Sequence, residues 1–199
     1  MRGVLAAVAV LAATLTLRAD PVTDDFNPAA SGAPLAHLRA PHLDQGDQGS
    51  VSQEFKARWA TTKAFTLEVA DAMPDADYGF KPTPGEMAFG ALMWHIAIAN
   101  EFRFSQVAGL AFQPPAGPLP SDKPTVLKGL AASFDHCAAI AEKLTPAQLD
   151  ASYQVDWVGM PDATGRQILA AMFTHTAHHR GQAEVYLRLK GIVPPKYRY

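Results

Sequence analysis

The 199-residue sequence contains a single cysteine, Cys137. One thiol can form neither a disulfide within the chain nor a cysteine-based zinc cluster, so any metal ion must be held by histidine and carboxylate side chains. Excess positive charge is also absent, because 17 Lys and Arg residues face 19 Asp and Glu residues and the net charge is -2. The chain therefore shows no basic footprint for nucleic acid, and its length suits one domain with a hydrophobic core.

The N-terminal apolar run is too short for an ordinary membrane span. Gly3–Leu17 follows the basic dipeptide Met1-Arg2 and falls short of the roughly 20 apolar residues that a spanning helix needs. This pattern is typical of a secretory signal peptide, with Ala19 as the last residue before cleavage. We therefore expect residues 1–19 to be removed and the mature protein to be exported, periplasmic or extracellular, without a stable membrane anchor. An uncleaved N-terminal anchor is the alternative.

The next segment, residues 20–50, is rich in Pro, Gly, Asp and Ala and has no sustained period. We interpret it as a flexible linker. From Val51 a helical period begins, and residues 51–193 are predicted to form one helical domain.

Four amphipathic helices are predicted in this domain. The first ends before Pro74, the second begins with a capping box at Thr83-Pro84-Gly85-Glu86, and the third begins near Lys123. The fourth begins at Thr164, where Gln167 completes a capping box, and ends at Gly191. Between the third and fourth helices we expect a short turn capped by Thr145, an extended segment around Val155, and a turn at Pro161-Asp162. This element pattern favours an all-α four-helix bundle.

Three histidines are the most informative feature of the chain. His175 and His179 are spaced i, i+4, so both imidazoles can reach one point on one face of the fourth helix. His95 lies on the predicted inward stripe of the second helix, with Ala91, Ile98 and Phe102. Three histidine ligands from two helices would leave one position of a divalent metal ion open, as in catalytic metal sites. A lone histidine on such a stripe is more often a satisfied core residue, but three of them favour a metal site.

Other residues near these histidines in the sequence or on the helical stripes allow more than one role. His178 lies about 100° around the helix from His179 and is the best candidate for a catalytic acid or base, although an ordinary interhelical or solvent-facing histidine fits equally well. Arg180 either anchors an anionic group or is a surface charge. Glu101 points to a different side of its helix from His95, and Cys137 is interpreted as a small core residue.

HTAHHRGQ, near the end of the last long helix, resembles the H-x-x-x-HRGQ motif of the DinB superfamily, and YGFKPTPGEMAFGALMWHIAIANEF resembles the second-helix region of that family. The resemblance covers roughly residues 53–189. It implies an up-down-down-up four-helix bundle with a divalent metal ion, often nickel or zinc, held by His95, His175 and His179. Some members of the family are transferases or isomerases that depend on a small thiol, bacillithiol or mycothiol, and members commonly dimerise. Because those thiols are cytosolic, the signal peptide argues against that activity here.

Three interpretations follow from the residues. In the first, the protein is an exported metalloprotein that acts as a metal-dependent hydrolase or transferase on a small molecule. In the second, the bundle binds metal or a ligand without turnover. In the third, the histidines are structural and satisfied by hydrogen bonds. An all-nitrogen ligand set suits zinc, nickel, copper or iron, and the sequence identifies neither the metal nor the substrate.

Overall fold

The computed structural model describes residues 51–113, 119–157 and 160–198. The predicted signal peptide and linker, residues 1–50, lie outside the described residues. Four long helices dominate the described part: α1 (Gln53–Ala72), α2 (Phe89–Ala108), α3 (Lys123–Ala141) and α5 (Gly165–Leu189). Within the described residues no helix has the length and apolar character that a membrane crossing requires. The prediction of an all-α bundle is confirmed.

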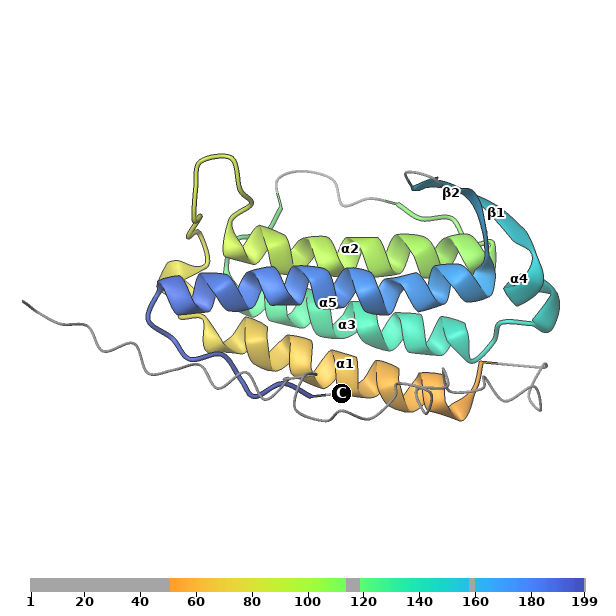
Figure 1. The fold of residues 1–199 in the computed structure, drawn as a ribbon, viewed down its shortest axis with the longest axis horizontal. Coiled ribbons are helices and arrows are strands. Elements are labelled where there is room, and N and C mark those ends of the chain that lie inside the picture. The colour runs from red at the N-terminus through yellow and green to blue at the C-terminus, as the bar shows by residue number, and fades with distance from the viewer. Residues whose placement is uncertain (1–50, 114–118, 158–159, 199) are drawn as a thin grey trace, which may run out of the picture. The chain divides into compact units, whose positions relative to one another are not determined.

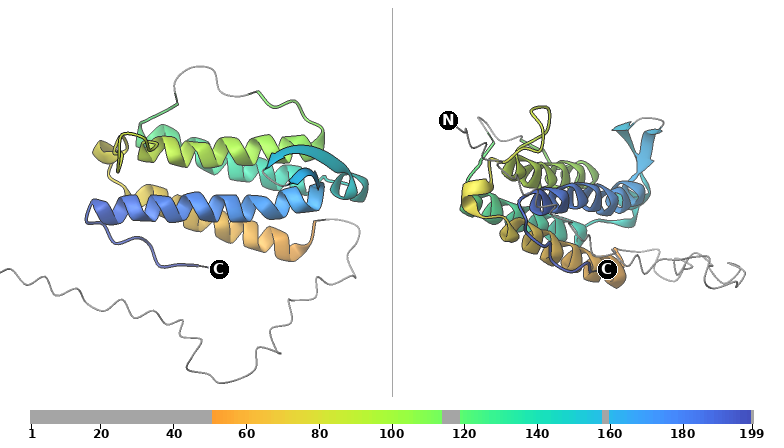
Figure 2. Two further views of the ribbon diagram at one scale, coloured as in Figure 1. Left: turned by 45° about the horizontal axis from the view of Figure 1, so that its top comes forward. Right: turned by 60° about the vertical axis from the view of Figure 1, so that its left-hand side comes forward.

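The four helices run up, down, down and up. Figure 1 shows α1 and α5 running in one direction and α2 and α3 in the other. Both α1 and α2 pack on α3 and on α5, so α1 and α2 occupy diagonal corners of the bundle. Figure 2 shows the same grouping from two further sides. Because α2 and α3 are parallel, the chain between them has to return along the length of the bundle. This explains why residues 109–122, which are rich in Pro and Gly, form such a long connection.

Side-chain caps start three of the four long helices. The Ser52 hydroxyl accepts a hydrogen bond from the backbone N–H of Phe55, and the Asp122 carboxylate accepts one from Thr125. At α5 the predicted capping box of Thr164 and Gln167 is present with both of its hydrogen bonds. Each cap satisfies an N–H that has no partner within its helix.

The start predicted for α2 is wrong. Thr83 and Glu86 form only a backbone turn, and the helix begins six residues later than Thr83, at Phe89. Loop carbonyls replace the side-chain cap, because Phe89 N–H donates to Phe80 O at 3.0 Å and Gly90 N–H donates to Tyr78 O at 2.9 Å. The buried Tyr78 ring lies where a Cβ on Gly90 would come within 3.0 Å. The loop is therefore packed onto the helix start and supplies the cap.

A short helix and a hairpin connect α3 to α5. The helix α4 (Pro146–Asp150) carries the predicted Thr145 capping box, and the predicted extended segment is the strand β1 (Ser152–Trp157). The turn predicted at Pro161-Asp162 is wrong, because both residues belong to β2 (Met160–Thr164), which pairs with β1 in antiparallel register. Gln106 Nε2 donates to Gln154 O at 2.7 Å, so the hairpin is fastened to the end of α2.

The hydrophobic core fills the space among the four long helices, and Cys137 is fully buried in it, as expected. The inward stripe predicted for α2 needs correction. The buried face of α2 is formed by residues such as Phe89, Met93, Ile96 and Phe104, whereas Phe102 is 40% exposed and His95 is only partly buried. His95 thus lies at the edge of the α2–α5 contact and not in the core.

Candidate metal centre

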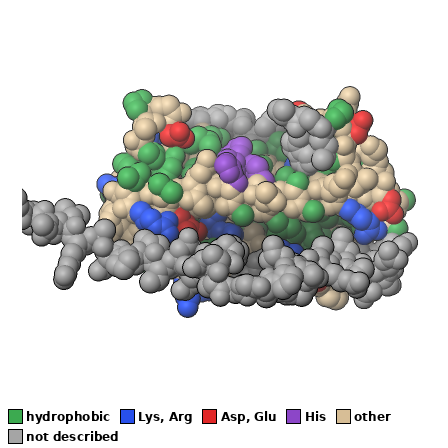
Figure 3. All heavy atoms as spheres, viewed as in Figure 1, with side chains coloured by type: hydrophobic (Ala, Val, Ile, Leu, Met, Phe, Trp, Pro, Cys, Tyr) green, Lys and Arg blue, Asp and Glu red, His purple; other side chains and the backbone are tan. Residues whose placement is uncertain are grey.

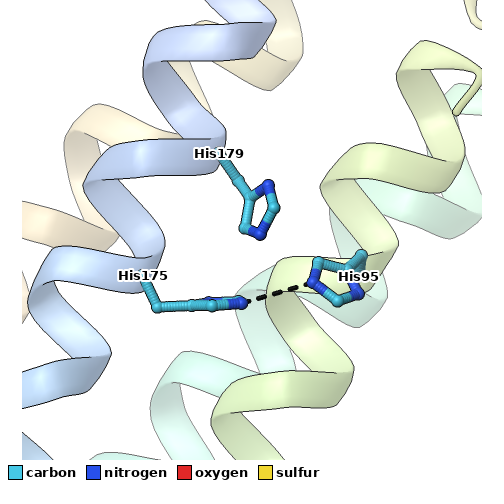
Figure 4. A group of neighbouring side chains, drawn as sticks. All are labelled: His95, His175 and His179. Atoms are coloured by element: carbon cyan, nitrogen blue, oxygen red, sulfur yellow. Dashed lines mark hydrogen bonds between the residues drawn. The ribbon is translucent and has the colours of Figure 1, made fainter. Parts of the chain in front are cut away.

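The three predicted histidines meet on the side of the bundle where α2 and α5 pack together. His95 comes from α2, and His175 and His179 come from successive turns of α5 (Figure 4). One nitrogen from each ring can be chosen so that all three lie within 4.8 Å of one another. His95 Nε2 and His175 Nε2 are 3.2 Å apart. On the face drawn in Figure 3 the histidine side chains gather at the surface, with hydrophobic side chains around them.

The helical period explains this position. The buried face of α5 passes through Met172, Thr176 and Arg180, and the last two directly follow the two histidines of the pair. His175 and His179 are therefore turned from the core toward the boundary between α5 and α2. All three rings are partly buried, so they are shielded from bulk water and still reachable from the surface.

All three imidazoles are neutral at neutral pH. Burial lowers the pKa of His175 to about 4. The nearby His179, His95 and His178 and the guanidinium of Arg103 lower it further. Burial also lowers the pKa of His95. The pKa of His179 is lowered too, and burial is the largest of its causes. A histidine must be neutral to offer a lone pair to a metal ion, so the site keeps its rings in the binding form.

The hydrogen bond between His179 and Gln182 fixes which nitrogen faces the cluster. His179 Nδ1 lies 2.8 Å from Gln182 Oε1. An amide oxygen only accepts, so the proton is on Nδ1 and the lone pair of the ring is on Nε2. A carbonyl-type partner on the far nitrogen is the usual support of a histidine metal ligand.

The geometry fits a transition metal ion better than it fits a set of mutual hydrogen bonds. Two nitrogens held at 2.0–2.1 Å from a tetrahedral metal ion lie about 3.3 Å apart, close to the 3.2 Å between His95 and His175. In a neutral ring only one nitrogen donates, and the buried Nδ1 of His175 has no hydrogen-bond partner among the residues that the structure describes. Three neutral lone-pair donors at this spacing match the ligands that zinc, nickel, copper and iron accept.

The other residues singled out in the sequence lie around this cluster. His178 is exposed, and its ring centre is 4.8 Å from that of His179. Arg180 is neither a surface charge nor directed at the cluster: it is buried, lies over the Phe65 ring at 4.3 Å, and donates to Thr66 Oγ1 at 3.4 Å. Glu101 contacts His136 of α3 at 2.7 Å and takes no part in the cluster.

A groove of about 580 Å³ opens beside the histidines, and His95 and His175 form part of its lining. Arg103 and Asp156 form an ion pair within this lining, and five apolar residues make up the rest: Ile98, Ala99, Phe102, Phe112 and Met172. Sequence reasoning missed Arg103, Asp156 and Phe112 as parts of the site. An arginine between two phenylalanines, Phe102 and Phe104, was a signal for Arg103. Asp156 and Phe112 come from a hairpin and a loop whose positions no local pattern specifies.

Comparisons with known proteins point to one family. A sequence model of the DinB superfamily matches residues 58–183. The uncharacterized protein YjoA of Bacillus subtilis is 27% identical over 141 residues, which is 70% of this chain and 91% of YjoA. The crystal structure of the DinB-like YjoA has a TM-score of 0.59 at 23% identity and covers 73% of this chain and 98% of its own. A DinB-like protein from Bacillus cereus gives a TM-score of 0.63 at 23% identity, covering 76% and 99%. These two structures support the fold alone.

Proposed function

The chain belongs to the DinB superfamily, and on this premise we propose that His95, His175 and His179 bind one divalent transition metal ion, zinc or nickel. The observation that carries the proposal is the convergence of three neutral imidazoles from two helices, with ligand nitrogens within 4.8 Å of one another. Gln182 supports the proposal by setting the tautomer of His179. Three protein ligands leave a coordination position for a water molecule or a substrate atom.

We further propose that the protein is a metal-dependent hydrolase or transferase acting on a small molecule. The bound metal would supply a Lewis acid and lower the pKa of a water or thiol in its open position. The chain's own part is to hold the three imidazoles neutral, to shield them from bulk water, and to receive the substrate in the groove beside His95 and His175. His178, exposed next to His179, is the proposed proton-transferring group.

Export completes the proposal. The basic start and the short apolar run of residues 1–19 support a signal peptide, so the mature protein would work outside the cytosol. Small cytosolic thiols would then be unavailable to it, and an ester, amide or similar substrate fits better than a thiol cofactor. Cell fractionation with an antibody against the bundle tests this, since full-length protein in the cytosolic fraction contradicts export.

One observation favours a second function, the binding of metal or a ligand without turnover. Among the described residues, the candidate metal cluster consists of histidine alone. The groove contributes one carboxylate, Asp156, and it is already paired with Arg103. A site without a free carboxylate has fewer groups that can move a proton, which suits a binding protein.

Elemental analysis of the mature protein, purified without a histidine tag, tests the metal site. We expect one transition metal ion per chain in the wild type and almost none in His179→Ala. His136→Ala is the matched control, because this histidine lies on α3 and contacts Glu101 outside the cluster. Circular dichroism verifies that each variant is folded. Absence of metal from the wild type, even after incubation with zinc and nickel, contradicts the proposal.

Turnover of ester, amide and thiol substrates separates the two functions. An enzyme should lose activity when the metal is removed and regain it on reloading, and His178→Gln should lower kcat while the metal content stays unchanged. A protein that binds metal without activity toward any of these classes is the binding protein. Activity that survives complete, verified metal removal contradicts metal-dependent catalysis.

A further inference from the structure

The lining of the groove beside the histidines indicates which kind of ligand the site can bind. We propose that the site receives molecules with a neutral, apolar body, whose polar head group reaches His95 and His175 while the body lies along the outer face of α2. This inference rests on the proposed metal site, because the head group is the part that would meet the metal. Nothing in the proposed function itself specifies an apolar substrate.

Phe102 and Phe112 form an aromatic pair in the lining of the groove. Phe102 is 40% exposed although it lies on a helix close to the metal centre. Its ring packs edge-on against Phe112, which comes from the chain between α2 and α3, with ring centres 5.4 Å apart. A partly exposed aromatic pair beside a candidate metal centre costs solubility unless it has a binding role. With Ile98, Ala99 and Met172 it forms a continuous apolar wall that begins at His95 and His175.

The charges in the groove cancel. Its lining contains one carboxylate and one guanidinium, and these two groups, Asp156 and Arg103, form an ion pair with each other. The Arg103 hydrogen bonds also lower the pKa of Asp156, so its carboxylate is ionised and matches the guanidinium charge. A charged ligand body would have to compete with this pair, whereas a neutral one would not.

The two charged side chains of the lining, Arg103 and Asp156, already have hydrogen-bond partners. Arg103 donates to Gln106 Oε1 at 3.0 Å as well as to Asp156, and its guanidinium lies 4.8 Å from the Phe102 ring centre. A sugar or phosphate body would lie mostly against apolar side chains in this groove and would give up hydrogen bonds to water there, which is costly. An apolar body has no such loss, and its burial against the wall is favourable.

The size of the groove fits a small molecule. A volume of about 580 Å³ lies within the range of about 300–1,000 Å³ found for ligand pockets. Continuity with the histidines favours a ligand with two parts, a head group at the metal and a body in the groove. The geometry thus assigns substrate selection to the apolar wall and metal binding to the histidines.

Two series of probes separate these roles. Butano-, hexano- and octanohydroxamic acids present a metal-binding head on chains of increasing length, and the primary amides of the same acids carry a weak head. Calorimetry and ligand-observed NMR on the zinc-loaded mature protein give the Kd of each probe. We expect Kd to tighten by about two- to fourfold per methylene in both series, and the hydroxamates to bind more tightly than the amides.

Variants test the wall directly. Phe102→Ser removes half of the aromatic pair and should therefore weaken the dependence of Kd on the chain length of the probe. Leu189→Ser is the matched control, since Leu189 is 57% exposed on α5 outside the groove. Asp156→Asn should leave the groove more positive and tighten the binding of a hydroxamate that ends in a carboxylate by several-fold relative to the wild type.

The outcomes are distinguishable. If Kd does not depend on chain length, the apolar groove is wrong even when hydroxamates bind through the metal. If hydroxamates and amides bind equally and both improve with chain length, the groove is supported and the metal site is wrong. A Phe102→Ser variant that keeps the full chain-length dependence, with the control unchanged, also overturns the assignment.

Discussion

Gln182 is the residue whose effect on the proposed metal centre can be predicted most directly. Its Oε1 accepts the Nδ1 proton of His179 and so directs the lone pair of Nε2 toward the cluster. We expect Gln182→Ala to weaken metal affinity by about 10- to 100-fold, the usual effect of losing such a partner. Gln182→Glu keeps an acceptor in place and should retain most of the affinity. Competition with a chromophoric chelator measures both, and equal losses in the two variants contradict this role.

Protonation of His175 predicts how the metal-free protein responds to acid. Its pKa is lowered by burial from the ordinary value of 6.5 to about 4. Below pH 6.5 the unfolded chain therefore takes up a proton that the folded protein does not bind, and the free energy of unfolding falls as the pH drops from 6.5 to 4. Stability from this group is complete above pH 6.5 and lost below the folded pKa.

Denaturant unfolding of chelator-treated protein across this pH window checks the prediction. His175→Gln replaces the titrating ring with a side chain that does not titrate, so the fall in stability should be shallower in this variant. The same decline in both proteins contradicts the lowered pKa of His175.

At this scale the sequence predicted the cluster but not its surroundings. The i, i+4 spacing of His175 and His179 places them on one helix face whatever the fold, and His95 was found through its position on a helix. Whether His95 points into the core depends on which neighbours cover α2, and no periodic pattern contains that information. Arg180 shows the same limit, because only the packing of α1 against α5 brings Phe65 under its guanidinium.

Among the elements, the contact between α2 and α3 depends on Gly129. A Cβ at this position would lie 2.0 Å from Cζ3 of Trp94, the residue before His95. Gly129→Ala should lower the free energy of unfolding by about 1–3 kcal/mol, the usual cost of overpacking, despite the better helix propensity of alanine. Gly181→Ala is the matched control on α5, because apart from its chain neighbours and the nearby helix backbone no described atom lies within 4 Å of its added Cβ. It should raise stability by about 0.5–1 kcal/mol. Urea unfolding measures both, and a neutral or stabilising Gly129→Ala contradicts the close contact.

Element boundaries were predictable where the signal is local. Thr164 with Gln167 and Thr145 with Gln148 are capping boxes within one helical turn, and both are present. The same kind of motif at Thr83 failed, because carbonyls of the preceding loop cap α2 from outside the helix. The turn predicted at Pro161 was wrong for a related reason. A proline lacks the backbone N–H, and both a turn and an edge strand such as β2 tolerate this.

For the whole molecule, the helical period of the sequence predicts four helices. The up-down-down-up order of their directions was implied only by the family resemblance. Helical period alone does not say that α2 and α3 run parallel or that α1 and α2 are diagonal. This topology matters for the site, because it makes α2 and α5 antiparallel neighbours and so brings His95 level with His175 and His179. The long connection after α2 also supplies Phe112 to the groove.

Metal binding and folding of the bundle should be linked. The proposed ligands come from α2 and α5, which are adjacent only in the folded protein, so a metal ion that binds them would stabilise the native state over the unfolded one. With free metal at about 100 times its Kd, the free energy of unfolding should rise by about 2.7 kcal/mol. For a domain of this size that is a rise in Tm of about 5–10 °C. Thermal unfolding with and without a chelator measures the shift. His136→Ala should keep the full shift and His179→Ala should lose it, because only the second removes a ligand. A shift of equal size in His179→Ala would place the stabilising metal elsewhere on the chain.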